Sequence, residues 1–290
     1  MLFSSLDDLA SKGQSLFAKG PVALILVEDE VELDSTLAHH LNCGFREVIA
    51  FMPQALPLPE GFEARVHRVD YDTHEPGATV AAVNLAISLT PPKVWLYYCY
   101  NAEYLFYPFS ETRRVGEMLA FHTEERRPAM LTYVIDLYTA DLEANPNGVN
   151  REDAMLDRAG YYALARLDPE NHNHPKERQL DFFGGLRWRF EEHVRENRRK
   201  IDRIGLFSAA QGLTLRADHT FSDEEYNTYS CPWHHNLTGA ILSFRAAKAL
   251  KTNPGSSWAI QDFRWYNAEP FQWNSQQLLD LGLIEPGQWF

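Results

Sequence analysis

Carboxylate and amide side chains follow directly after three apolar runs of this sequence, where buried strands are expected to end. They are Glu28 and Glu30, Asp70 and Asp72, and Asn101 and Glu103. Because the carboxyl ends of parallel strands meet at one edge of a sheet, these side chains are expected to converge on a ligand site. The alternative is that strand ends are exposed and tolerate acidic residues anywhere.

Two arginines stand in the segment Gly184-Gly185-Leu186-Arg187-Trp188-Arg189-Phe190. A guanidinium group offers paired donors that match a phosphate, so Arg187 and Arg189 are candidates for binding a diphosphate. The alternation of Arg and Trp is also compatible with an edge strand that turns its aromatic rings inward. A second basic group, Arg198 to Lys200, is better explained as a solvated surface.

Three further residues are candidates for acid–base chemistry by their position alone. Asp181 and Asp218 are candidate general bases, and His219 could orient a phosphate or an acceptor. The competing interpretations are that the two aspartates cap turns and that the histidine is an ordinary surface residue.

A zinc site is weakly indicated. The spacing from Cys231 to His234 is Cys-x-x-His, with His172, His174 and His219 elsewhere in the same half of the chain. Structural zinc needs four placed ligands, and no second paired spacing is present, so buried or hydrogen-bonded histidines are expected instead. Motifs for P-loop nucleotide binding, dinucleotide binding and the hydrolase nucleophile elbow are missing from the sequence.

The apolar pattern predicts the elements that would position these groups. Over about the first 105 residues, strands are expected at 22–27, 47–51, 63–69 and 94–99, with helices at 31–42 and 79–89. This alternation predicts an α/β fold with a doubly wound, mostly parallel sheet flanked by helices. Farther along, we expect a helix at 114–127, a strand at 130–138, irregular structure at 145–174 and a helix at 238–250. A tail rich in tryptophan ends the sequence, with Trp258, Trp265, Trp273, Trp289 and Phe290.

Composition limits the class of protein. The chain has 290 residues, 45% of them hydrophobic, and a formal net charge of −13. That sign disfavours general nucleic-acid binding. No apolar run approaches the length of a membrane span, and the acidic N-terminus does not resemble a secretory signal, so we expect a cytoplasmic protein. Three cysteines, Cys43, Cys99 and Cys231, suggest reduced thiols and no disulfide framework.

Four segments, in this order, resemble the family 2 glycosyltransferases of the GT-A fold, especially short bacterial members. Glu28-Asp29-Glu30 with the Leu37-to-Phe45 helix resembles the Lys-Asn-Glu segment of the family, and Tyr100-Asn101-Ala102-Glu103-Tyr104-Leu105 stands at its Asp-x-Asp-Glu-Phe-Leu motif. Gly184 to Phe190 resembles Gly-Gly-x-Arg-x-Arg, and Gly239 to Arg245 resembles Gly-Ala-Leu-Leu-His-Phe-Lys. The resemblance covers about residues 20 to 250 and is carried by the order of the motifs.

The departures from the family pattern concern its divalent metal, which the two aspartates bind together with the diphosphate. Tyr100 and Ala102 stand at those two positions, and Ser243 stands at the later histidine. An aspartate that follows the second strand in many relatives is replaced within Phe51-Met52-Pro53. We therefore expect no metal site and no other cofactor.

The resemblance implies one domain with an N-terminal helix at 1–20, a nucleotide-binding half at 21–108 and an acceptor-side half with the Trp-rich tail at 109–290. It implies transfer of a sugar from a nucleotide-sugar donor to a glycan or another hydroxyl acceptor, here without metal. Glu28, Glu30, Asp70, Asp72, Asn101, Glu103, Arg187 and Arg189 are then the expected donor-binding residues. The alternative is an inactive GT-A-like protein that binds or scaffolds, with its aromatic tail suited to stacking or to a second copy of the chain.

Overall fold

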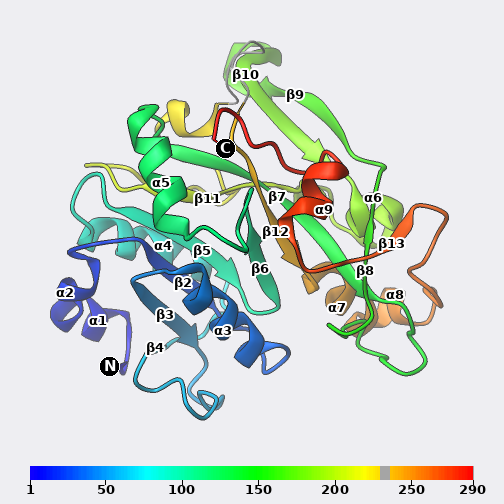
Figure 1. Ribbon diagram of the computed structural model, residues 1–290, viewed down its shortest axis with the longest axis horizontal. Coiled ribbons are helices and arrows are strands. Elements are labelled where there is room, and N and C mark those ends of the chain that lie inside the picture. The colour runs from blue at the N-terminus through cyan, green and yellow to red at the C-terminus, as the bar shows by residue number, and fades with distance from the viewer. Residues whose placement is uncertain (229–235, 290) are drawn as a thin grey trace. The chain divides into compact units, whose positions relative to one another are not determined.

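The computed structural model describes residues 1–228 and 236–289 (Figure 1). The chain divides into two compact units. The first unit comprises Met1–Tyr104, Thr112–Leu131 and Ile204–Asn227. The second comprises Leu105–Glu111, Thr132–Arg203 and Thr228–Phe290.

A parallel sheet forms the core of the first unit. Its strands are β1 (Leu2–Phe3), β4 (Val66–Asp70), β3 (Glu47–Met52), β2 (Val22–Leu26) and β5 (Trp95–Tyr100), in that spatial order. β11 (Asp202–Ser208) pairs antiparallel with β5. Every residue of β2 and β5 is buried, as expected for strands that are covered on both faces. The first unit is therefore an α/β structure with a mixed sheet, and its parallel core fits a Rossmann-like fold.

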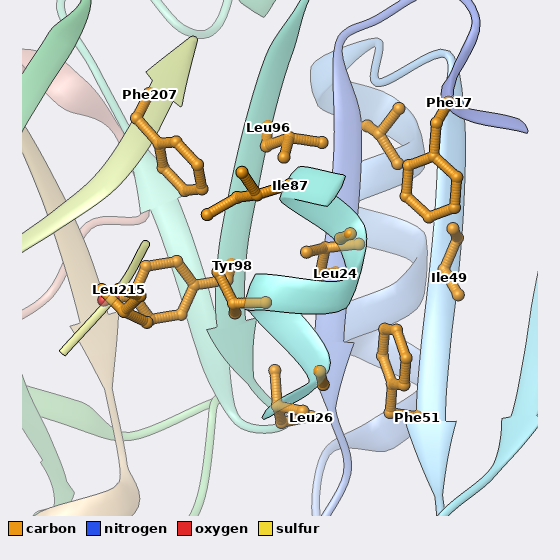
Figure 2. Close-up of a cluster of buried hydrophobic side chains, with 14 of the residues drawn as sticks. Phe17, Leu24, Leu26, Ile49, Phe51, Ile87, Leu96, Tyr98, Phe207 and Leu215 are labelled. Carbon is orange, nitrogen blue, oxygen red and sulfur yellow. The ribbon is translucent and has the colours of Figure 1, made fainter. Parts of the chain in front are cut away.

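The two faces of this sheet are covered by different helices. α4 (Ala78–Leu89) packs its apolar side chains against Leu24, Phe51 and Tyr98, and Ile87 projects toward this cluster (Figure 2). On the other face, His40 of α3 (Leu33–Cys43) stacks on Tyr97 with ring centroids 5.3 Å apart. Because successive strand residues point to opposite faces, neighbouring positions of β5 serve both layers.

The expected elements of this unit are present, with shifted ends. The N-terminal helix expected at 1–20 is interrupted at Gly13 and forms α1 (Leu6–Lys12) and α2 (Gln14–Phe17). β1 was not predicted, because two residues carry no periodic pattern. α5 (Val115–Glu124) is shorter than the helix expected at 114–127, and β6 (Glu103–Phe106) begins three residues after β5.

The second unit is built on β7 (Ala129–Thr139), which pairs in parallel with β12 (Gly239–Ser243) and antiparallel with β8 (Ala154–Asp157). β13 (Ala268–Pro270) extends the sheet beside β8, and β9 (Tyr162–Asp168) and β10 (His174–Phe183) form a separate antiparallel hairpin (Figure 1). The helices are α6 (Gly185–Arg189), α7 (Arg245–Thr252), α8 (Pro254–Ser257) and α9 (Ser275–Asp280). Tyr138, Leu186 and Phe263 are among the residues of its buried core.

Three expectations for this unit are wrong. The helix expected at 238–250 is a buried strand, β12, followed by α7, because a short apolar run does not distinguish a strand from a helix. The region expected to be irregular, 145–174, contains β8 and the whole of β9. The segment with the two arginines is helical, so the edge-strand alternative is wrong. No helix among the described residues is long and apolar enough to cross a membrane.

Candidate functional site

The carboxyl ends of β2 and β5 are held together by one buried side chain, Asn101. Its Oδ1 accepts a hydrogen bond from the backbone N–H of Glu28 at 2.9 Å. Its Nδ2 donates to the carbonyl oxygens of Asp29 (3.1 Å) and Val31 (2.9 Å) and to Asp29 Oδ1 (2.8 Å). Asn101 is 0% exposed, so these bonds fix the loop after β2 against the end of β5.

The turn from Tyr100 to Glu103 is a rigid connection between β5 and β6. Glu103 is buried, and its Oε2 accepts a hydrogen bond from the N–H of Tyr100 at 2.9 Å. Ala102 has a left-handed φ of 58°, and its N–H donates to Thr36 Oγ1 at 2.9 Å. Asn101 and Glu103, both predicted to bind the donor, therefore have defined structural contacts, and their contact with a ligand stays a prediction.

The residues at the metal positions of the resembled family do not fit a hard cation, which needs oxygen ligands. The phenol of Tyr100 lies 2.7 Å from Thr79 Oγ1, and Ala102 offers only a buried methyl group. In the second unit, Ser243 Oγ accepts a hydrogen bond from the N–H of Arg245. Within residues 1–228 and 236–289, no group of three or more His, Cys, Asp or Glu side chains could hold a metal ion.

The predicted acidic residues Glu28, Glu30, Asp70 and Asp72 lie at or just after the carboxyl ends of β2 and β4 but have different surroundings. Glu28 is half-buried and Glu30 is exposed, and both lie on the loop that Asn101 holds. Asp70 accepts a hydrogen bond from Arg68 Nε at 2.7 Å. Asp72 is exposed and receives the N–H of His74 at 3.0 Å.

A threonine joins the loops that follow β4 and β2. The hydroxyl of Thr73 donates to the carbonyl oxygen of Val27 at 2.6 Å. The polar groups after β4, β2 and β5 thus share the carboxyl edge of one parallel sheet, which agrees with the predicted arrangement. Such an edge is where open α/β sheets bind ligands.

Asp218 and His219 belong to the first unit and lie in a turn. Asp218 Oδ1 accepts hydrogen bonds from the N–H of Thr220 at 3.1 Å and from its hydroxyl at 2.7 Å. His219 stacks on Tyr98 with an interplanar angle of 6°, and its Nδ1 lies 3.1 Å from the Tyr98 hydroxyl. Both residues thus organise the chain locally, and their proposed acid–base roles stay predictions.

A cysteine–histidine pair in the core has a structural explanation. His40 Nδ1 donates to the carbonyl oxygen of Thr36 at 2.8 Å, so Nε2, 3.6 Å from Cys99 Sγ, is left to accept from the thiol. Burial, helped by the neighbouring His39, lowers the pKa of His40 to about 3. Both side chains are fully buried, so this pair packs the sheet against α3.

In the second unit, Arg187 lies beside a buried aspartate that the sequence did not identify. Asp136, on β7, is 1% exposed, and its Oδ1 is 3.5 Å from Arg187 Nε. Arg187 Nη1 also donates to the carbonyl oxygen of Lys200 at 3.0 Å. Burial raises the pKa of Asp136 to about 6, against the opposing effect of Arg187. A Cβ at Gly185, which has φ +63°, would lie 2.9 Å from Asp136 Oδ2, so this close approach requires glycine.

Arg189 forms a second buried ion pair, with Asp157 on β8. Its Nη1 donates to both carboxylate oxygens of Asp157, at 2.9 and 3.1 Å, and its Nη2 donates to the carbonyl oxygen of Phe263. Asp157 Oδ1 also accepts hydrogen bonds from the Tyr138 hydroxyl at 2.6 Å and from Trp265 Nε1 at 2.7 Å. The guanidinium group lies 4.7 Å from the centroid of the Trp265 ring. This is a satisfied network of buried charges.

Asp181 is also ion-paired. Arg166 Nε donates to its Oδ1 at 2.7 Å, and Lys200 Nζ lies 2.8 Å from its Oδ2. Arg166 also contacts Asp202, so two cations and two carboxylates join the β9–β10 hairpin to the start of β11. A role for Asp181 as a base stays a prediction.

Sequence reasoning missed Asp136 and Asp157. Asp136 could have been found from the sequence, because it stands inside the apolar run of β7, and a buried carboxylate needs a charged or hydrogen-bonding partner. Cys231, His234 and Phe290 lie outside the described residues; Cys43 and Cys99 are both buried. No protein-family model matches this chain, and no curated protein sequence matches it.

Proposed function

We propose that this chain is a glycosyltransferase-like protein that binds a nucleotide sugar at the carboxyl ends of β2 and β5 and transfers the sugar to a hydroxyl acceptor without a metal. The observation that carries the proposal is the strand order β4-β3-β2-β5. The chain runs from β2 to β3 and β4 on one side of β2 and then crosses, through α4, to β5 on the other side, and ligands of open α/β sheets bind where the order reverses in this way. The loop after β2 is held there by Asn101.

The chemistry of this edge favours the nucleoside part of the donor. Carboxylates at Glu28, Glu30 and Asp72 accept hydrogen bonds, which suits ribose hydroxyls and the N–H groups of a base. The same carboxylates repel a diphosphate, whose charge must be met by cations. Arg187 and Arg189 stay the residues predicted for that role, although each is paired with a buried carboxylate.

The transfer step itself requires a base that removes the proton from the acceptor hydroxyl as its oxygen forms a bond to the anomeric carbon. The bond from that carbon to the diphosphate breaks, and the diphosphate leaves with the electron pair. Asp218 and His219 are the candidates in the first unit. Asp218 Oδ1 receives two hydrogen bonds from Thr220, so an inactive protein that only binds the nucleotide is the second candidate function.

Isothermal titration calorimetry with UDP, GDP and their sugars, each with Mn²⁺ and with EDTA, tests the proposal. We expect one nucleotide to bind with an affinity that EDTA does not change. Failure of all of them to bind would refute the proposed site, and binding that requires Mn²⁺ would refute the metal-free chemistry.

Release of UDP or GDP from the bound nucleotide sugar separates the two candidate functions. Slow release in water, accelerated by a hydroxyl acceptor, is expected for a transferase. Tight binding with an intact donor after prolonged incubation would favour the inactive binding protein.

A further inference from the structure

Five aromatic rings form a continuous row on the second unit, which we call the aromatic strip. Its members, in order of contact, are Phe183, Tyr162, Trp188, Trp265 and Tyr266. Phe183 and Tyr162 are opposite each other in the β9–β10 hairpin, and their rings stack 5.3 Å apart at 18°. The next three ring centroid distances are 6.4, 6.3 and 4.8 Å.

Three members of the aromatic strip are exposed to solvent, although large aromatic side chains are usually buried. Tyr162 is 42% exposed, Trp188 is 38% exposed and Tyr266 is 81% exposed. Single exposed apolar residues are common, but a contiguous exposed set of large rings is typical of a binding surface. Core packing explains Phe263 and Phe190, which contact each other in the buried cluster of this unit, but it does not explain these three exposed rings.

The buried ion pair beneath the strip holds it in place. Trp265 donates its indole N–H to Asp157 Oδ1, and Arg189 lies against the same ring. A Cβ at Gly160, which has φ +99°, would lie 3.2 Å from Trp265 and 3.5 Å from Trp188, so glycine permits this packing. A rigid surface loses little conformational entropy when it binds a ligand.

The size and charge of the strip decide what it fits. Its five rings are far fewer than the 20 to 30 residues that each side of a typical stable protein interface contributes. No member of the strip carries a charge, and the guanidinium group against Trp265 is paired with Asp157, so the rings themselves suit a neutral ligand. Flat, uncharged rings fit a ligand that has apolar C–H faces and polar edges.

We infer that the aromatic strip binds a neutral oligosaccharide, whose sugar rings stack along it. Exposed Arg158 and half-buried Asn267 stand beside it, joined by the backbone hydrogen bond from Arg158 N to the Asn267 carbonyl at 3.0 Å, and can contact hydroxyls at its edge. The assignment of this saccharide as the acceptor rests on the proposed function, whereas its binding does not.

Calorimetry and tryptophan fluorescence with cellohexaose and maltohexaose, in the absence of nucleotide, test the inference on the full chain. We expect at least one of these probes to bind. Trp188→Ala and Tyr266→Ala should each lower its affinity about tenfold, and Trp188→Phe, which keeps a ring, should lower it less.

Trp258→Ala is the matched control, because Trp258 is 86% exposed and lies outside the strip. The affinity of the Trp258→Ala variant for the oligosaccharide should stay within about twofold of that of the parent protein. Circular dichroism of each variant verifies that it is folded, and Trp188→Phe keeps the test decisive if Trp188→Ala does not fold.

Three results would overturn the inference. They are binding of neither oligosaccharide, an equal loss of affinity in Trp258→Ala, or a concentration-dependent dimer that Trp188→Ala abolishes. Because nucleotide binding is measured separately, failure of the strip to bind saccharide leaves the proposed nucleotide site standing, and the converse also holds.

Discussion

Replacing Asn101 by alanine should have two effects: it should loosen the loop after β2 and weaken nucleotide binding. The substitution removes four hydrogen bonds, one from the N–H of Glu28 and three to acceptors on Asp29 and Val31. A buried group that loses its partner costs about 1–3 kcal/mol, but Asp29 and Val31 are only half-buried and can regain water. We therefore expect the free energy of unfolding to fall by about 2–4 kcal/mol.

Urea unfolding followed by circular dichroism measures that loss, and calorimetry with UDP or GDP measures binding. For the nucleotide that the parent protein binds, the dissociation constant of the variant should be at least about tenfold higher, which corresponds to about 1.4 kcal/mol of binding free energy. The reason is that Glu28 and Glu30 lie on the loop that Asn101 fixes.

Asn84→Ala is the matched control in the same unit. Asn84 lies on α4, and its side chain makes two hydrogen bonds with the backbone of Leu215, at 3.0 and 2.7 Å. It should lose about 1–2 kcal/mol of stability with unchanged nucleotide affinity. Stability of Asn101→Ala within about 0.5 kcal/mol of the parent would refute the assignment of Asn101 as the anchor of the loop. A loss of stability without a loss of nucleotide affinity would refute the proposed location of the nucleotide.

Three other changes test the remaining parts of the structure. Tyr100→Asp combined with Ala102→Asp should create Mn²⁺ binding that calorimetry detects, because two carboxylates suit the ion and aspartate tolerates the left-handed φ at position 102. Equal Mn²⁺ binding by the parent protein would contradict this prediction. Burial raises the pKa of Asp136 to about 6, so the stability from its bound proton is complete below about pH 4 and is lost as the pH rises through 6. Relative to Asp136→Asn, the parent should lose about 1–3 kcal/mol between pH 4 and 7 in urea unfolding, and a constant difference would exclude this titration. Gly185→Ala should lower the free energy of unfolding by about 2–4 kcal/mol. Gly212→Ala is the control and should lower it less, because Gly212 also has a left-handed φ (+76°) but a Cβ there would meet nothing within 4 Å. Equal losses of stability would show that contact with Asp136 adds no cost.

The parallel core was predictable because its strands are short apolar runs that end in polar residues. β2 and β5 are buried on both faces, and that pattern is visible in the residues themselves. β12 was not predictable from its own residues, because Gly239 to Ser243 are followed by helix-forming residues and the whole stretch reads as one element. Pairing with β7, a contact distant in sequence, makes it a strand.

The place of Asn101 in the fold was predictable, but its contacts were not. Asn101 was expected at the end of β5, and the structure places it there. That its amide would hold the loop after β2 depends on pairing of β2 with β5 across more than 70 residues, which local pattern does not encode. The partners of Arg187 and Arg189 were missed for the same reason, since Asp136 and Asp157 lie on separate strands.

The two predicted anion-binding arginines differ in what an anion must displace. Arg189 donates to both oxygens of Asp157, at 2.9 and 3.1 Å, and breaking such a buried pair costs about 3–5 kcal/mol. Arg187 lies 3.5 Å from Asp136, whose pKa of about 6 means that a small drop in pH removes the competing charge. A phosphate oxygen therefore meets less competition at Arg187 than at Arg189, and protonation of Asp136 strengthens that preference. If either arginine binds a diphosphate, it should be Arg187, while Arg189 keeps Asp157 and the Trp265 ring of the aromatic strip in place.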